Sequence, residues 1–276
     1  MKSTKAGVLA LALILAVTGN AAAHYSFIYP EKFRVSPGEA LVVGFHASDG
    51  FPDSTQLPRR LQSHSVHTAS GTSAIAELRD DACDDKGKCL RQAGTVTLPA
   101  GYSILTAVNP ARSADMKPQE FTDYLKEESL TQIIDERAKL GETDKPGRER
   151  YSMYLKSIVL AGTPNDRYKQ VVGLPIEIVP EKDFFQLKSG ESLPVRVLFK
   201  GAPAANLQLF ATTKGKPAQK FGKTDANGRI AVPVTSGPWR LHTILMERVT
   251  LPEADWESFW ATLTFEIPQR PGSANP

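Results

Sequence analysis

The sequence predicts a mainly β protein made of two β-sandwich domains, the first of which carries a short helical insertion. Apolar and polar residues alternate through most of the chain, as in residues 193–199 and 230–234, which is the pattern of half-buried strands. Gly, Pro, Asn and Asp gather between these runs and mark turns. Helical spacing is confined to residues 118–140 or so.

The N-terminal segment has the pattern of a secretory signal peptide. Basic residues precede an apolar run from Ala6 to Val17, and the small residues 21–23 form an A-x-A cleavage site. The apolar run is about a dozen residues, whereas a membrane-spanning helix needs roughly 20. We therefore expect residues 1–23 to be removed on export to the periplasm, which makes His24 the first residue of the mature chain.

The first sandwich is expected over residues 24–170. Its strands are indicated by alternation at residues 25–29, 41–45, 61–68, 95–98, 102–108 and 151–160. The segments 95–98 and 102–108, separated by Pro99-Ala100-Gly101, predict a hairpin.

The helical insertion is expected at about 118–140. Pro118 suits the first turn of a helix, and Phe121 and Leu125 follow at helical spacing. A second helix over residues 130–140 ends at Gly141.

The second sandwich is expected over residues 171–268. Short alternating runs are separated by turns such as Asp225-Ala226-Asn227-Gly228, which tolerates positive φ. Residues 269–276 are expected to form a disordered tail.

Cys83 and Cys89 are the two cysteines, and they flank a polar turn in a chain expected to reach an oxidising compartment. We predict a disulfide that closes a hairpin tip. A redox pair or two thiolate ligands are the alternatives, but C-x-x-C spacing is absent and one pair cannot complete a tetrahedral site.

The charge and the motifs favour binding over catalysis. The net charge of +3 includes Lys2 and Lys5, so the mature chain is close to +1, and no nucleic-acid partner is implied. The sequence contains no G-x-S-x-G, H-E-x-x-H or Gly-rich phosphate loop. We therefore predict that the protein is not an enzyme.

Histidines are the candidate metal ligands, because imidazole suits nickel, copper and zinc. They are His24, His46, His64, His67 and His242. A processed His24 would offer its α-amine and its imidazole Nδ1 to one metal ion. The alternative is that His24 merely follows the cleavage site.

The alternation of strands predicts where the other histidines point. His24 and His46 would point away from the core, opposite Tyr25 and Phe27 in one strand and opposite Val43 and Phe45 in the other. A strand would send His64 and His67 to opposite faces. His242 shares a face with Arg240 and Ile244, and a solvated or rim position is its alternative.

Four further residues have competing interpretations. Asp49 and Asp53 could complete a metal site, although surface solvation is the more ordinary role. Trp256 and Trp260 could form a partner-binding patch, but we expect them to pack a short helical turn against the sandwich.

Several motifs resemble those of a bacterial periplasmic family. They are Ala23-His24, residues 121–128, residues 145–152, Gly173-Leu174-Pro175 and residues 255–260. The family is related to the NikM proteins and is labelled as the periplasmic component of nickel or cobalt uptake systems. The resemblance implies a divalent nickel or cobalt ion and membrane transporter subunits as partners, and it carries only His24 over as a site residue. Residues 223–229 and 237–239 also resemble a transthyretin-like sandwich.

Three functions follow as expectations. The first is a periplasmic transition-metal-binding protein that serves uptake. The second is an interaction module of the cell envelope that binds no metal. The third is a copper protein or oxidative enzyme with an N-terminal histidine brace.

Overall fold

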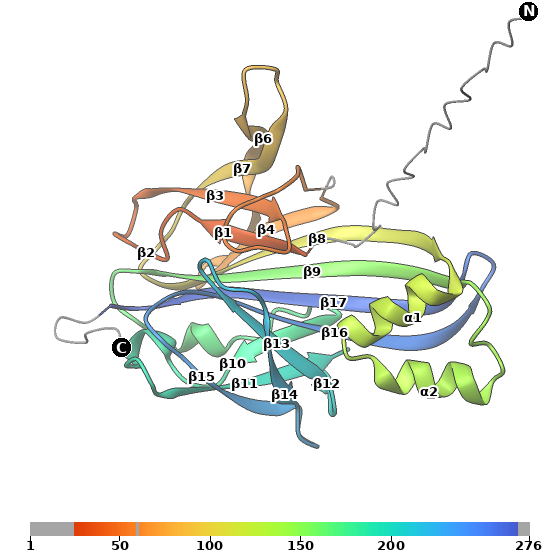
Figure 1. The fold of residues 1–276 in the computed structure, drawn as a ribbon. Helices are drawn as coiled ribbons and strands as arrows, with labels where there is room; N and C mark the ends of the chain where they lie inside the picture. The colour runs from red at the N-terminus through yellow and green to blue at the C-terminus, as the bar shows by residue number, and fades with distance from the viewer. Residues whose placement is uncertain (1–24, 59–60, 270–276) are drawn as a thin grey trace, which may run out of the picture.

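A nine-stranded central sheet runs through the computed structural model, which describes residues 25–58 and 61–269 (Figure 1). In spatial order its strands are β14 (Gln219–Lys223), β13 (Gln208–Thr213), β16 (Gly237–Leu251), β17 (Ala254–Ile267), β9 (Gly147–Ala161), β8 (Gly101–Met116), β4 (Ser63–Thr68) and β5 (Gly71–Ala74), with β2 (Arg34–Val35) paired to β9. The pairs β9–β17 and β2–β9 are parallel, and the other neighbours are antiparallel.

Two smaller sheets cover the two faces of the central sheet. The N-terminal sheet contains β1 (Ser26–Pro30), β3 (Ala40–Ala47), β7 (Cys89–Thr97) and β6 (Ala76–Cys83). The C-terminal sheet contains β10 (Ile176–Pro180), β11 (Ser192–Phe199), β12 (Ala202–Pro203) and β15 (Arg229–Pro233). Met153, Leu155 and Val159 of β9 pack in the core beneath the N-terminal sheet, whereas Ile158 and Leu160 pack in the other core. The architecture therefore has three β layers (Figure 1).

The mainly β class is confirmed, but the expected division into separate sandwiches at residue 170 is corrected. Residues Trp256–Thr264 of β17 pair with Glu149–Ser157 of β9, so the central sheet joins strands from both halves of the chain. The reason is that both of these strands are buried on both faces. A strand of this kind belongs inside a layered structure rather than at its surface.

The predicted hairpin of residues 95–108 is wrong. β7 belongs to the N-terminal sheet and β8 to the central sheet, so Pro99-Ala100-Gly101 carries the chain from one layer to the next.

The helical insertion is confirmed between β8 and β9. It consists of α1 (Pro118–Glu127) and α2 (Thr131–Lys139). Phe121 is fully buried, and a Cβ added to Gly147 would lie 2.1 Å from its ring. This close approach packs α1 directly on the start of β9. Two short 3-10 helices, Asp166–Lys169 and Phe184–Gln186, complete the elements.

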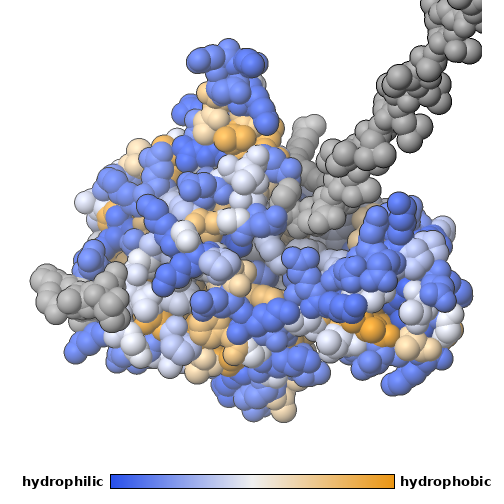
Figure 2. All heavy atoms as spheres, in the orientation of Figure 1, coloured by the Kyte–Doolittle hydropathy of each residue, from blue (hydrophilic) through white to orange (hydrophobic). Residues whose placement is uncertain are grey.

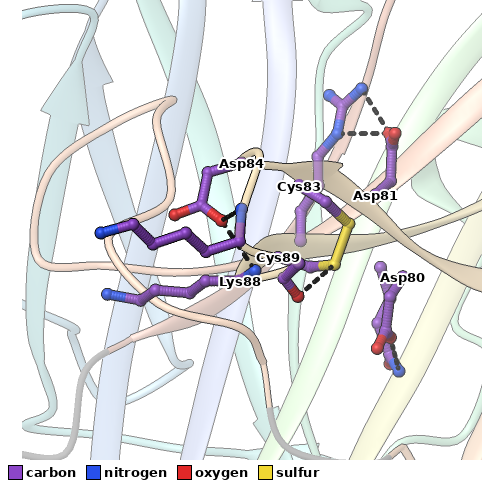
Figure 3. The surroundings of a disulfide bond; sticks show 10 residues. Asp80, Asp81, Cys83, Asp84, Lys88 and Cys89 are labelled. Carbon is purple, nitrogen blue, oxygen red and sulfur yellow. Dashed lines mark hydrogen bonds and ion pairs between the residues drawn. A yellow bond between two sulfur atoms is a disulfide. The ribbon is translucent and has the colours of Figure 1, made fainter.

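The predicted disulfide is confirmed between Cys83 and Cys89, where it joins the ends of β6 and β7 (Figure 3). The carboxylate of Asp84 accepts hydrogen bonds from the backbone N–H groups of Lys86 and Lys88, both at 2.9 Å. This hairpin projects from the body (Figure 1), and Figure 2 shows that its end is hydrophilic. The disulfide therefore stabilises a local turn outside both cores.

Replacing both cysteines by Ala should lower the free energy of unfolding by about 2 kcal/mol, the chain-entropy value for so short a loop. Because the hairpin end lies outside both cores, ligand binding should persist. Urea unfolding of the oxidised protein and of the double variant measures the difference, and a loss of the folded state would contradict a local role.

In the described ranges, no helix is long and apolar enough to cross a membrane.

Candidate functional site

Tyr25 is the first described residue, and it lies in a buried polar cluster. Its hydroxyl donates a 2.5 Å hydrogen bond to Oε1 of Glu128, and its ring centroid lies 4.1 Å from that of His242. The guanidinium carbon of Arg240 lies 5.1 Å from the same ring. We call Tyr25, Glu128, Arg240 and His242 the Tyr25 cluster.

Three elements bring this cluster together. β16 carries Arg240 and His242 on one face and Leu241 on the other. The first of these faces also places Ile244 in the core beneath the N-terminal sheet. β1 lies edge-on against β17, since the Thr264 hydroxyl donates a 2.6 Å hydrogen bond to a β1 backbone carbonyl. Glu128 caps the C-terminal end of α1. The start of the described chain is thus held between the insertion and the central sheet.

Arg240 fixes a loop over the cluster. Its guanidinium donates 3.0 Å hydrogen bonds to the backbone carbonyls of Ser48, Asp49 and Gly50. Burial lowers the pKa of Arg240 to about 10, with nearby acids partly offsetting the shift, so the side chain stays charged at neutral pH.

His242 is 1% exposed and lies between two aromatic rings. The Phe210 ring stacks on the imidazole with the two centroids 4.6 Å apart, and the Tyr25 ring contacts the imidazole in a tilted arrangement. Neither ring nitrogen has a hydrogen-bond partner within the described part of the chain. Burial, and then the charge of Arg240, hold the pKa of His242 well below its usual range, so the imidazole is neutral and has a free lone pair.

Glu128 is 6% exposed, and its Oε2 has no hydrogen-bond partner among the described residues. Burial raises the pKa of Glu128 to about 7, although the hydrogen bond from Tyr25 opposes the shift. Buried polar atoms normally have partners, and leaving one unpaired costs about 1–3 kcal/mol. The unpaired atoms of Glu128 and His242 therefore indicate a missing ligand, water or residue.

A second buried carboxylate lies close by. Glu149 accepts hydrogen bonds from the hydroxyls of Ser258 and Tyr124, and the Tyr124 bond is 3.0 Å long. Tyr124 stacks on Trp260, whose ring lies 5.5 Å from that of Tyr25. Burial raises the pKa of Glu149 to about 7.

His24 itself lies outside the described residues. β1 begins at Ser26, so the alternation of that strand does not settle the direction of the His24 side chain.

The prediction that His46 points out of the core is wrong. His46 does lie opposite Val43 and Phe45, but it stacks on Phe27 at 5.2 Å and is 5% exposed. Phe51 also packs against Phe27 of β1, so the N-terminal sheet is buried on both of its faces at this point. Its Nδ1 lies 2.8 Å from the Ser54 hydroxyl, and burial lowers the pKa of His46 to about 3.

His64 and His67 lie on the strand β4, as predicted, and face opposite sides. His64 lies toward Phe45 of the N-terminal sheet, and its buried Nδ1 has no partner in the described ranges. Both ring nitrogens of His67 are hydrogen-bonded at 2.9 Å, to the hydroxyls of Thr72 and Thr106.

The alternative given for His242, a solvated or rim position, is also wrong, because Tyr25 and the loop held by Arg240 cover that face. The structure thus places His242 beside Tyr25 and keeps His46, His64 and His67 elsewhere. Across residues 25–58 and 61–269, no group of three or more His, Cys, Asp or Glu residues could hold a metal ion. A metal site at the cluster would therefore need His24.

The two tryptophans and the two loop aspartates singled out in the sequence lie in different environments. Trp256 and Trp260 are buried as expected, but on the strand β17 rather than on a helical turn. Asp49 contributes its backbone carbonyl to Arg240, and Asp53 is exposed. Sequence reasoning missed Glu128, whose hydrogen bond to Tyr25 spans 103 residues and has no local signal.

One family model matches residues 21–247, and its description is "Domain of unknown function (DUF4198)". No curated protein matches the chain. The matched region includes every member of the Tyr25 cluster and crosses residue 170, where the boundary between two domains was expected. The chain therefore belongs to the DUF4198 family.

Proposed function

We propose that this protein is an exported transition-metal-binding protein whose metal ion is held by the processed His24 and by His242. The carrying observation is the position of His242: its two ring nitrogens are buried and unpaired within the described chain, and its ring contacts Tyr25. His24 directly precedes Tyr25 in the sequence, and the proposal is that its donors reach the imidazole that the Tyr25 ring contacts.

The chemistry of the donors supports this assignment. A processed His24 supplies an amine and an imidazole, and His242 adds a third nitrogen. Such a set suits Cu²⁺, Ni²⁺ and Zn²⁺, and in a bare competition it should prefer Cu²⁺ over Ni²⁺ and Co²⁺. Arg240 opposes a cation at this position, and the Glu128 carboxylate offsets that charge.

The biological role is proposed from the resemblance to the NikM-related proteins. It supports nickel or cobalt as the cargo and membrane transporter subunits as the partners. The signal-peptide pattern supports a periplasmic location.

His242→Phe tests the proposal, because Phe preserves the stack between Tyr25 and Phe210 and removes both nitrogens. Calorimetric titration with Ni²⁺ of protein beginning at His24 should show at least about a tenfold loss of affinity, since losing even an outer partner of a ligand commonly costs 10–100-fold.

His46→Phe is the matched control, because His46 is similarly buried but its ring contacts Phe27 and Tyr29 rather than Tyr25 or Phe210. Its affinity should be unchanged. A loss caused by His64→Gln instead of His242→Phe would show that the second imidazole is His64. Absence of Ni²⁺ and Cu²⁺ binding in the unmodified processed protein would favour the interaction module.

A further inference from the structure

Two hydrogen bonds between a tyrosine and a carboxyl group join the helical insertion to the body of the protein. Tyr124 on α1 donates a 3.0 Å hydrogen bond to Glu149, near the start of β9. At the end of the same helix, Glu128 accepts a 2.5 Å hydrogen bond from Tyr25, which precedes β1. Because Tyr124 and Glu128 are four residues apart, both lie on the face of α1 that meets the body.

Trp260 of β17 connects these two hydrogen bonds. The Tyr124 ring stacks on Trp260 with the two centroids 6.2 Å apart, and the Tyr25 ring lies 5.5 Å from it. The indole N–H of Trp260 donates a 2.9 Å hydrogen bond to Ser258, whose hydroxyl donates to Glu149. The insertion therefore closes over one connected group of side chains.

The insertion can move without breaking a sheet. It forms the connection between β8 and β9, whose last paired residues are Met116 and Gly147. Phe121 and Leu125 of α1 are fully buried, and their apolar contacts favour the closed arrangement. The state of the two carboxyl groups can therefore shift a balance between a closed and an open insertion.

Glu128 and Glu149 are both buried in the closed arrangement. Burial raises the pKa of each to about 7, although the hydroxyl groups that donate to them oppose the shift. Hydroxyls of Ser258 and Tyr124 face Glu149. Besides the Tyr25 hydroxyl, the groups that face Glu128 are Glu127, Asp49, Lys220 and Arg240.

The two cations that face Glu128 direct their hydrogen bonds elsewhere. Arg240 donates to the backbone carbonyls of residues 48–50 and to Thr212. Lys220 donates to the backbone carbonyl of Lys126, at 3.5 Å. The charge of Lys220 lowers the pKa of Glu128, but burial outweighs it. Ionisation of this carboxyl group therefore remains unfavourable while the insertion is closed.

We infer that the helical insertion is a pH-sensitive latch, which lies closed on Trp260 while Glu128 and Glu149 are protonated and opens when they ionise. In the open state water solvates both carboxylates, so they release their protons more readily than in the closed state. A rise in pH therefore favours opening. Opening would uncover Tyr25 and Trp260, and it does not depend on metal binding.

Native-state hydrogen exchange of the full chain at pH 6 and pH 8 tests the latch, with each rate corrected for the intrinsic rate at that pH. Between these pH values the protection of the α1 amides should fall by up to about 100-fold, about tenfold for each carboxyl group whose pKa returns from about 7 to about 4.5. The α1 amides should respond little to low urea, because a local opening exposes little surface. Those of β16 and β17 should show the full urea dependence of global unfolding.

Glu128→Gln combined with Glu149→Gln should leave the α1 amides equally protected at both pH values, because Gln is neutral and keeps the shape of the protonated acid. Glu142→Gln is the matched control. Glu142 belongs to the same insertion, and hydrogen bonds from Arg248 of β16 lower its pKa. It stays ionised from pH 6 to pH 8, so this variant should keep the full pH dependence.

Three results would overturn the inference. The first is equal protection of the α1 amides at pH 6 and pH 8 in the unmodified protein. The second is a urea dependence of these amides equal to that of β16 and β17, which would show that the insertion opens only with the whole fold. The third is an unchanged pH dependence in the double variant. The first two need only the unmodified protein, so they hold even if the double variant fails to fold.

Discussion

Replacing Lys156 by Met should lower the free energy of unfolding by about 3–5 kcal/mol, the usual cost of breaking a buried ion pair. Lys156 of β9 donates a 2.6 Å hydrogen bond to Glu177 of β10, and both side chains are 2% exposed or less. The pair connects the central sheet to the C-terminal sheet. Met fills a similar volume but leaves the Glu177 carboxylate buried without its cation.

The double variant Lys156→Met with Glu177→Gln separates charge from packing. Gln can still accept from the backbone N–H groups of Val172 and Gly173, which bind Glu177 at 3.1–3.2 Å. We expect it to recover most of the loss in urea unfolding. Lys32→Met, which breaks an exposed pair with Glu39, should change little. Equal losses in the single and double variants would contradict a charge effect.

Glu149→Gln should remove a pH-dependent loss of stability of about 3 kcal/mol. Burial raises the pKa of Glu149 from near 4.5 to about 7, so the folded protein holds this proton more tightly than the unfolded chain does. As the pH rises from 4.5 to 7, the unfolded chain releases the proton first and the folded state is progressively destabilised. The difference between these two pKa values corresponds to about 3 kcal/mol.

Urea unfolding at pH 5 and pH 8 measures this effect. The unmodified protein should lose more stability between these pH values than Glu149→Gln does, because Gln resembles the protonated acid at both. Glu128, whose pKa is also raised to about 7, adds a loss of the same sign to both proteins and cancels in the comparison. Glu253→Gln, at an exposed position, should keep the full pH dependence. A parallel pH dependence in Glu149→Gln would contradict this account.

Local patterns in the sequence predict much of the fold. Alternation identified several strands, including β1, β3 and β11. Pro118 and the spacing of Phe121 and Leu125 identified α1, and the polar turn between Cys83 and Cys89 identified the disulfide. These features depend on neighbours in the sequence, and such neighbours fix local geometry.

Alternation gives the face on which a side chain lies, but not what covers that face. His46 and His242 illustrate this limit, since both lie on the expected side of their strands and both are buried. The parallel pairing of β9 with β17 and the hydrogen bond from Tyr25 to Glu128 join residues roughly 100 positions apart. No local pattern specifies such contacts, which is why the Tyr25 cluster could not be predicted.

The most direct test of the metal-binding proposal changes only the start of the chain. Calorimetric titration with Cu²⁺ and Ni²⁺ would compare protein beginning at His24, the same protein with one residue added before His24, and His24→Ala. The added residue converts the amine of His24 into an amide and leaves the imidazole, so only the chelate is lost. We expect strong binding to the first protein, with Cu²⁺ tighter than Ni²⁺, and much weaker binding to the other two. Equal affinities for all three proteins would contradict the claim that the processed N-terminus holds the metal.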